Sequence, residues 1–248
     1  MLNFFDAHLG ERFAAFSPSH TAALAILAAA VVLMAVFRYR LCKQGVRLAL
    51  AAVLLMCEAA LNVWYVTQHI WSVRNTLPLE LCSITLLLSV VMLVTRNYML
   101  YEIVYFAGIA GALQALLTPN LGYAYPHFRF FHFFIAHAGI VLAALYMTLV
   151  EGYRPSFKSI LRVMLFLNVL AVLVWGVDRW AGANYMFLAG KPETASVLDW
   201  FGPYPYYLLV EELLALVMFL LLYAPFAGRA SYRAKGESEA DTTAMTRR

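Results

Sequence analysis

Apolar stretches of about 20 residues recur along the chain, separated by short polar segments. They lie at about residues 20–37, 47–70, 79–95, 98–117, 130–150, 159–180 and 205–226. Each is close to the length that crosses the apolar core of a bilayer as a helix. Backbone groups in a bilayer must be satisfied within helices or closed barrels, and continuous apolar runs favour helices. The pattern predicts an all-α polytopic membrane protein, a bundle of about seven transmembrane helices.

Composition supports lipid as the surrounding solvent. Of the 248 residues, 63% are hydrophobic and 13% charged, and the mean hydropathy is +0.73, whereas soluble domains are about half apolar and a quarter charged. We expect residues 1–227 to form a single transmembrane helical domain and residues 228–248 a disordered cytoplasmic tail. We expect no cleavable signal peptide, because residues 1–18 lack a basic start before an apolar stretch. The expected location is the cell membrane, crossed several times, with membrane lipids as partners.

The basic residues predict an orientation. With the N-terminus outside, 13 Lys and Arg residues fall on the inner side and 5 on the outer side, which by the positive-inside rule favours N-out and C-in. Basic residues spread in this way indicate membrane topology, so we expect no nucleic-acid partner. The weakest of the predicted spans is residues 79–95, which is short, follows Pro78 and could be re-entrant. The sequence does not indicate an oligomeric state.

Polar side chains interrupt the second stretch at helical spacing. Glu58, Asn62, Tyr65 and His69 are spaced i, i+4, i+7 and i+11, so they share one helix face. Such a stripe can be a hydrogen-bonded interface between helices. A carboxyl group near mid-span is costly to bury and more often functional. Glu58 is therefore a candidate for a functional residue as well as for a helix-interface residue.

Three of the six histidines lie in residues 119–141, where an aromatic loop turns into an apolar stretch. His132 and His137 are five residues apart, which points them about 140° apart on a helix and places His137 about 7.5 Å deeper. Each can be a packed, hydrogen-bonded histidine or a functional one. We expect His137 to matter more, because a deep imidazole needs a partner or a task.

Further polar groups start or end neighbouring stretches at the same predicted depth. Glu80 and Cys82 follow Pro78, Gln114 closes the fourth stretch, and Glu211 lies in the first turns of the last one. A thiol near a helix N-terminus can be nucleophilic, although a lone cysteine in an apolar span is usually a small core residue. Convergence from several helices predicts one outward-facing polar pocket.

Several stretches resemble the YwaF-type family of bacterial integral membrane proteins. They are residues 77–82 (LPLELC), 111–119 (GALQALLTP), 131–139 (FHFFIAHAG), 183–188 (ANYMFL) and 198–203 (LDWFGP). That family is similar to animal membrane proteins that handle lipid acyl chains. One moves acyl groups between phospholipids with a cysteine, and others hydrolyse fatty-acid esters with a threonine and a histidine.

The resemblance carries over residue by residue. His137 matches the histidine that opens the fifth helix, and Asn184 lies in a matching stretch. In the animal transferase a cysteine and then a histidine follow the proline of the third helix. The corresponding positions here are Leu79 and Glu80, and Cys82 lies one helical turn later.

The leading hypothesis is therefore an enzyme that transfers or hydrolyses lipid acyl esters. Cys82 would attack the ester with His137 as general base, Gln114 or Asn62 would donate to the oxyanion, and Glu58 or Glu211 would orient the imidazole. Ser83 and water stay open as other nucleophiles. The remaining residues predicted to bind substrate are Tyr65, His69, Glu80, His132 and Asn184.

Two other hypotheses stay open. One is a metal-dependent seven-helix intramembrane hydrolase, in which His69, His132 and His137 would join Glu58 or Glu211 at zinc. The sequence has no tight ligand motif, and we expect neither a metal nor a cofactor. The other is a non-enzymatic solute or lipid transporter or binding protein, whose polar stripe lines a pathway.

Overall fold

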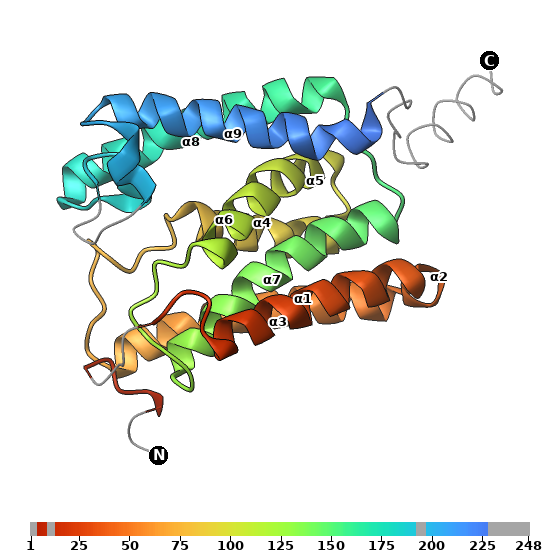
Figure 1. The fold of residues 1–248 in the computed structure, drawn as a ribbon, viewed down its shortest axis with the longest axis horizontal. Helices are drawn as coiled ribbons and strands as arrows, with labels where there is room; N and C mark the ends of the chain where they lie inside the picture. The colour runs from red at the N-terminus through yellow and green to blue at the C-terminus, as the bar shows by residue number, and fades with distance from the viewer. Residues whose placement is uncertain (1–3, 9–12, 192–196, 228–248) are drawn as a thin grey trace.

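The computed structural model describes residues 4–8, 13–191 and 197–227. This part of the chain is helical and contains no β-strand. The α-helices are α1 (Pro18–Val36), α2 (Arg38–Leu41), α3 (Gln44–Thr67), α4 (Leu81–Thr95), α5 (Tyr98–Ile103), α6 (Ile109–Leu117), α7 (Phe128–Leu149), α8 (Phe157–Ala181) and α9 (Tyr206–Tyr223) (Figure 1). A π-helical segment, Val104–Gly108, joins α5 to α6, and 3-10 turns lie at Tyr185–Phe187, Val197–Phe201 and Ala224–Phe226.

The helical membrane architecture is confirmed. Six helices are long and apolar enough to cross a membrane: Pro18–Val36, Gln44–Thr67, Tyr98–Leu117, Phe128–Leu149, Phe157–Ala181 and Tyr206–Phe226. The remaining predicted stretch, residues 79–95, forms α4, whose 15 residues extend about 22 Å, less than the apolar thickness of about 30 Å. The orientation of the termini stays a prediction, and the tail 228–248 lies outside the described residues.

The helices form two groups. In the larger group α7 packs against α1, α3, α4 and α6. The other group consists of α8 and α9, which lie along one side in Figure 1. Few of their residues are buried, and apolar side chains such as Leu165, Leu173, Leu209 and Leu213 are exposed. In a bilayer these exposed side chains contact lipid.

Close helix packing in the larger group depends on small residues. At Gly139 of α7, an added Cβ atom would lie 2.5 Å from Cδ2 of Leu54 on α3, well inside van der Waals contact. The glycine thus lets α3 and α7 approach closely, as small residues do in membrane bundles. The face of α3 that carries its polar side chains is brought against α7 in this way.

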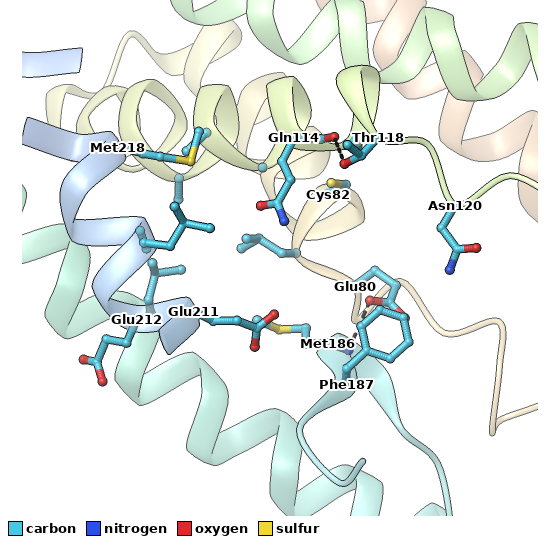
Figure 2. Close-up of a pocket in the computed structure, with 18 of the residues that line it drawn as sticks. Glu80, Cys82, Gln114, Thr118, Asn120, Met186, Phe187, Glu211, Glu212 and Met218 are labelled. Atoms are coloured by element: carbon cyan, nitrogen blue, oxygen red, sulfur yellow. Dashed lines mark hydrogen bonds between the residues drawn. The ribbon is translucent and has the colours of Figure 1, made fainter. Parts of the chain in front are cut away.

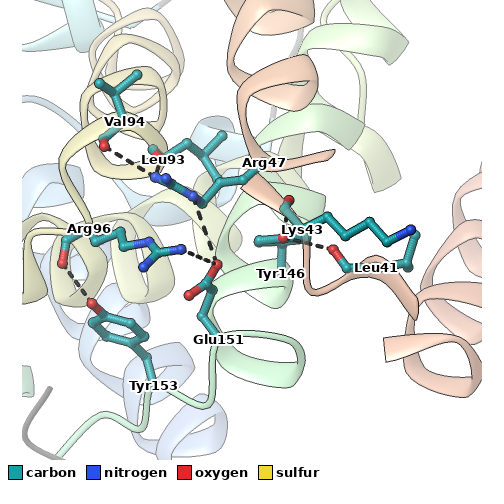
Figure 3. A network of polar contacts seen from close by, with 9 residues as sticks. All are labelled: Leu41, Lys43, Arg47, Leu93, Val94, Arg96, Tyr146, Glu151 and Tyr153. Atoms are coloured by element: carbon teal, nitrogen blue, oxygen red, sulfur yellow. Dashed lines mark hydrogen bonds and ion pairs between the residues drawn. The ribbon is translucent and has the colours of Figure 1, made fainter. Parts of the chain in front are cut away.

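An arginine joins three helices at the predicted inner end (Figure 3). The buried Arg47 of α3 donates to the carbonyl oxygens of Leu93 and Val94 at the end of α4. Its Nε lies 3.8 Å from a carboxylate oxygen of Glu151, just after α7, and Arg96 lies 3.3 Å from the same oxygen. The side chain thereby satisfies carbonyls that a helix end leaves unpaired.

The α8–α9 group is tied to the rest at both ends. At the predicted inner end, Ser159 donates to the buried Glu102, and Arg162 lies 2.9 Å from the same carboxylate. At the other end, the hydroxyl of Tyr185 donates to the carbonyl of Val73 at 2.7 Å and accepts from the amide of Leu77 at 2.9 Å. Between these attachments the two groups of helices separate around a cavity.

Candidate functional site

A cavity of about 1010 Å³ lies between the two helix groups (Figure 2). One wall comes from α4, the π-helical segment and α6, and the other from α8, α9 and the turn at 186–188. Most lining side chains are apolar. The polar ones are Glu80, Cys82, Gln114, Thr118, Asn120, Asn168, Asp199, Glu211 and Glu212. This combination of apolar wall and few polar groups is typical of a small-molecule site.

Cys82 places a free thiol on the cavity wall in the first turn of α4. The helix begins there because Glu80, as its N-cap residue, has extended backbone angles. Gly111 of α6 lies behind the thiol, and a Cβ atom added there would be 3.9 Å from the sulfur. The helix N-terminus favours negative charge at this position, but burial and, to a smaller extent, the Glu80 carboxyl raise the pKa of the Cys82 thiol. A base must therefore take its proton before the sulfur can act as a nucleophile.

Glu80 lies at the edge of the same cavity. One of its carboxylate oxygens accepts a hydrogen bond from the amide of Met186 at 3.1 Å. Displacement of water by the surrounding atoms raises the pKa of Glu80, Asp178 adds to the rise, and the bond from Met186 opposes it. The side chain keeps accessible surface toward the cavity, so it can exchange a proton with a ligand there.

Gln114 and two adjacent glutamates complete the polar lining. The amide of Gln114 extends from α6 into the cavity (Figure 2). Glu212 of α9 accepts a hydrogen bond from the side-chain amide of Asn168 on α8 at 2.8 Å. Glu211 extends into the cavity (Figure 2), and within residues 4–8, 13–191 and 197–227 it has no hydrogen-bond or ion-pair partner.

A second polar group, which we call the α3–α7 cluster, lies elsewhere and consists of Glu58, Asn62, Arg129, His132 and His137. Asn62 donates to Glu58 at 3.3 Å, and Arg129 lies 3.2 Å from Nδ1 of His132. Nδ1 of His137 lies 2.7 Å from the carbonyl oxygen of Phe133 one turn earlier. His132 and His137 are equally buried, each 8% exposed, although His132 was expected nearer to water.

The structure therefore divides the single pocket that the sequence predicts. Cys82, Glu80, Gln114 and Glu211 share the cavity, whereas Glu58, Asn62, Tyr65, His69, His132 and His137 are not among its lining residues. Phe133 lines the cavity, and its ring centroid lies 4.2 Å from that of His137. Among the described residues, no hydrogen bond joins Cys82 to His137. The roles predicted for these side chains stay predictions.

The other predicted residues have local partners. Tyr65 lies beneath Arg129, whose guanidinium carbon is 5.9 Å from the tyrosine ring centroid. His69 follows the end of α3, is exposed and has a left-handed backbone with φ of 56°. Asn184 donates to the carbonyl of Gly190 at 2.8 Å and accepts from the amide of Ala189 at 3.0 Å. Asn184 thus organises its own loop.

Sequence reasoning missed several lining residues. Thr118 and Asn120 flank a proline at the end of α6, and Met186 and Phe187 lie in the turn after α8. The motif Thr118–Asn120 indicates a helix end, but it does not show that the following loop borders a cavity. Met186 and Phe187 lie in the stretch 183–188 that resembles the YwaF-type family, but no local pattern places them at a cavity, because their positive φ values of 54° and 55° arise in the folded turn.

No shared metal site emerges from the described part of the chain. Within it, no three His, Cys, Asp or Glu side chains are grouped closely enough to hold a metal ion. The ligand set of the metal-dependent hypothesis is split, because His69 follows α3 at the surface while His132 and His137 lie on α7. Those residues therefore do not form one zinc site in this arrangement.

The fold and the cavity define a multi-pass helical membrane protein. Comparison of the chain with known families then identifies it further: residues 15–223 match the TMEM164 family, and the chain belongs to that family. A protein of Treponema pallidum (strain Nichols) described as "Uncharacterized protein" is 30% identical over 154 residues, which are 62% of this chain and 63% of that protein. No solved structure matches significantly. Membership of a membrane-protein family is thus confirmed, whereas the YwaF-type resemblance stays a prediction.

Proposed function

We propose that this protein is an intramembrane enzyme that transfers or hydrolyses acyl groups of membrane lipids, with Cys82 as the nucleophile. The observation that carries the proposal is the cavity, which combines about 1010 Å³ of mainly apolar space with a thiol, an amide and carboxyl groups. An apolar wall suits an acyl chain, and the few polar groups suit the ester at its end. The exposed apolar faces of α8 and α9 border lipid on their other side.

The proposed chemistry begins at Cys82. Its sulfur forms a bond to the ester carbonyl carbon while a carboxylate takes the thiol proton. The bond from that carbon to the alcohol oxygen then breaks, and the departing oxygen takes up the proton. The product is a thioester on Cys82 and a free lysolipid. The side-chain amide of Gln114, in the same cavity, would donate a hydrogen bond to the carbonyl oxygen as it gains negative charge.

The second half of the reaction releases the acyl group. The hydroxyl oxygen of a lysolipid, or water, bonds to the thioester carbon as its proton passes to the carboxylate. The carbon–sulfur bond breaks, and the thiolate regains the proton. We assign the proton-carrying carboxylate to Glu80, because it lines the cavity two residues from Cys82. His137 is not a lining residue, and its ring contacts the cavity-lining ring of Phe133, so it is less well placed to take the thiol proton.

The second candidate function is lipid binding or transport without turnover. It is favoured by one observation, that no histidine is found among the described residues lining the cavity. Cysteine nucleophiles are usually activated by a neighbouring base such as histidine. A mainly apolar cavity with a few polar groups and no such base fits a binding protein as well as an enzyme.

An acyl-transfer assay separates the two candidates. The purified protein in phosphatidylcholine vesicles would receive a phospholipid with a labelled acyl chain and an unlabelled lysophospholipid, and mass spectrometry would follow the label. We expect label in the acceptor or in free fatty acid, its loss in Cys82→Ala, and its retention in the control Cys42→Ala, whose cysteine is exposed. Equal turnover in Cys82→Ala would contradict the proposal, and bound lipid without turnover would favour the carrier.

A further inference from the structure

The charged side chains among the described lining residues of the cavity are all of one sign. Its described lining residues include four carboxyl side chains, Glu80, Asp199, Glu211 and Glu212, and no Lys, Arg or His. An anionic ligand would therefore meet carboxylates and no basic side chain among these lining residues, although Lys191 lies behind Asp199. Like charges close together in an apolar environment are strongly unfavourable.

Three of the four carboxyl groups already have partners. Glu80 accepts from the amide of Met186, Glu212 accepts from Asn168, and Asp199 lies 4.0 Å from the ammonium nitrogen of Lys191. Glu211 is different, because within the described chain it has neither a hydrogen bond nor an ion pair. It is the carboxyl group left to meet a ligand.

The position of Glu211 makes an unpaired carboxyl group costly. It lies five residues after the start of α9, about 7.5 Å along the helix axis, within a segment long and apolar enough to span a membrane. Ionisable groups at such positions usually face a cavity and pair with another group. Glu211 extends into the cavity (Figure 2), where apolar residues such as Leu208, Leu214 and Ala215 share the lining.

We propose that the cavity selects its ligand by charge, and that Glu211 is the selecting residue. The ligand class is an amphiphile with an apolar chain and a cationic, hydrogen-bond-donating group, of which a primary ammonium is the simplest form. Amphiphiles with an anionic group at the depth of Glu211 are rejected. This inference rests on the proposed function in placing the ligand in the same cavity, but it concerns binding and requires no turnover.

The adjacent residue supplies a matched control. Glu212 has the same side chain, but it is occupied by Asn168 and extends away from the centre of the cavity (Figure 2). Glu211→Gln and Glu212→Gln each remove one negative charge with little change in volume. A general effect of surface charge on a cationic amphiphile would be equal in the two variants, whereas pairing with Glu211 would be lost in one alone.

The experiment reads ligand occupancy at Cys82. In a protein with Cys42→Ala and Cys57→Ala, reconstituted in nanodiscs, the rate of Cys82 labelling by a small maleimide would be measured with tetradecylamine, tetradecanol or tetradecanoate. We expect the amine to protect Cys82 at a concentration at least tenfold lower than the alcohol, and tetradecanoate to protect least. In Glu211→Gln the amine and the alcohol should come within about twofold, whereas Glu212→Gln should keep the preference.

Two results would overturn the inference: tetradecanoate protecting as well as the amine, or Glu211→Gln keeping the amine preference. The thermal shift that each amphiphile causes in the Cys82→Ser protein gives a second measurement, independent of thiol reactivity. Amine preference without acyl transfer would contradict the proposed function alone. Acyl transfer without amine preference would contradict this inference alone.

Discussion

At the scale of the residue, Phe133 is the lining side chain that contacts His137. Its ring lines the cavity and contacts the tilted ring of His137, whose Nδ1 lies 2.7 Å from the Phe133 carbonyl oxygen. The imidazole thus lies behind the cavity wall. Glu80 lies on that wall beside the first turn of α4, so a carboxylate is better placed for proton transfer than the histidine.

We therefore predict that Glu80→Gln lowers acyl transfer more than His137→Ala does. Loss of a general base typically reduces the rate by about 10²–10⁴-fold, and we expect that range for Glu80→Gln. Labelled-acyl transfer would be compared at equal amounts of folded protein. If His137→Ala were inactive and Glu80→Gln normal, the imidazole would be the base, and Phe133 would have to move during catalysis.

The pH dependence of transfer gives a separate test of Glu80. Its pKa is raised from the ordinary value of 4.5 by desolvation, and only the ionised carboxylate can accept a proton. Activity should therefore rise with pH through the raised pKa, so that the acidic limb of the rate profile lies above pH 4.5. Glu80→Gln should remove this limb. A limb that persists in that variant would belong to another group.

At the scale of the element, α4 is held at one end by a side chain of a neighbouring helix. It is too short to cross the apolar core at full thickness, and its last carbonyl oxygens are met by Arg47 of α3. Its other end carries Cys82 on the cavity wall. The position of the thiol is thus coupled to a polar contact at the opposite end of the helix.

Arg47→Ala should consequently destabilise the protein far more than Arg96→Ala. The side chain of Arg47 is 6% exposed and that of Arg96 49%, although both approach Glu151. Removing one partner of a buried ion pair costs about 3–5 kcal/mol, whereas an exposed pair contributes less than about 1 kcal/mol. Thermal unfolding in detergent measures both variants, and equal losses would show that burial of Arg47 contributes little.

At the scale of the whole molecule, much of the fold follows from the sequence because the bilayer restricts the choices. Continuous apolar runs of spanning length favour helices there, and the predicted stretches correspond to α1, α3, α4, α5–α6, α7, α8 and α9. The shortness of α4 follows from Pro78 and from Arg96. Arg96 ends the helix in a left-handed conformation with φ of 57°.

The candidate site was predictable only in part. Cys82, Glu80, Gln114 and Glu211 could be placed near one depth by counting along their helices, and they share the cavity. Glu58 and His137 lie at helical positions that look equally suitable, yet they belong to the α3–α7 cluster. Periodicity gives the face of a helix but does not say which neighbouring helix that face contacts.

The orientation of the whole bundle is a prediction from 13 inner and 5 outer basic residues. A reporter fused after Arg248 should read as cytoplasmic, and a tag in the loop after α8, which ends at Ala181, should be accessible from outside intact cells. The positive-inside rule is the physical basis. The reverse pattern would place the Cys82 end of the cavity toward the cytoplasm.

The most direct test of the central claim is the intact mass of the protein after brief exposure to a phospholipid without an acceptor. The account predicts a gain equal to one acyl group minus one hydrogen atom, located on Cys82 by peptide mapping and released by neutral hydroxylamine as a thioester is. Cys82→Ala should show no gain, and Cys57→Ala should gain the same mass. Turnover of the phospholipid without any acyl group on Cys82 would contradict the cysteine mechanism.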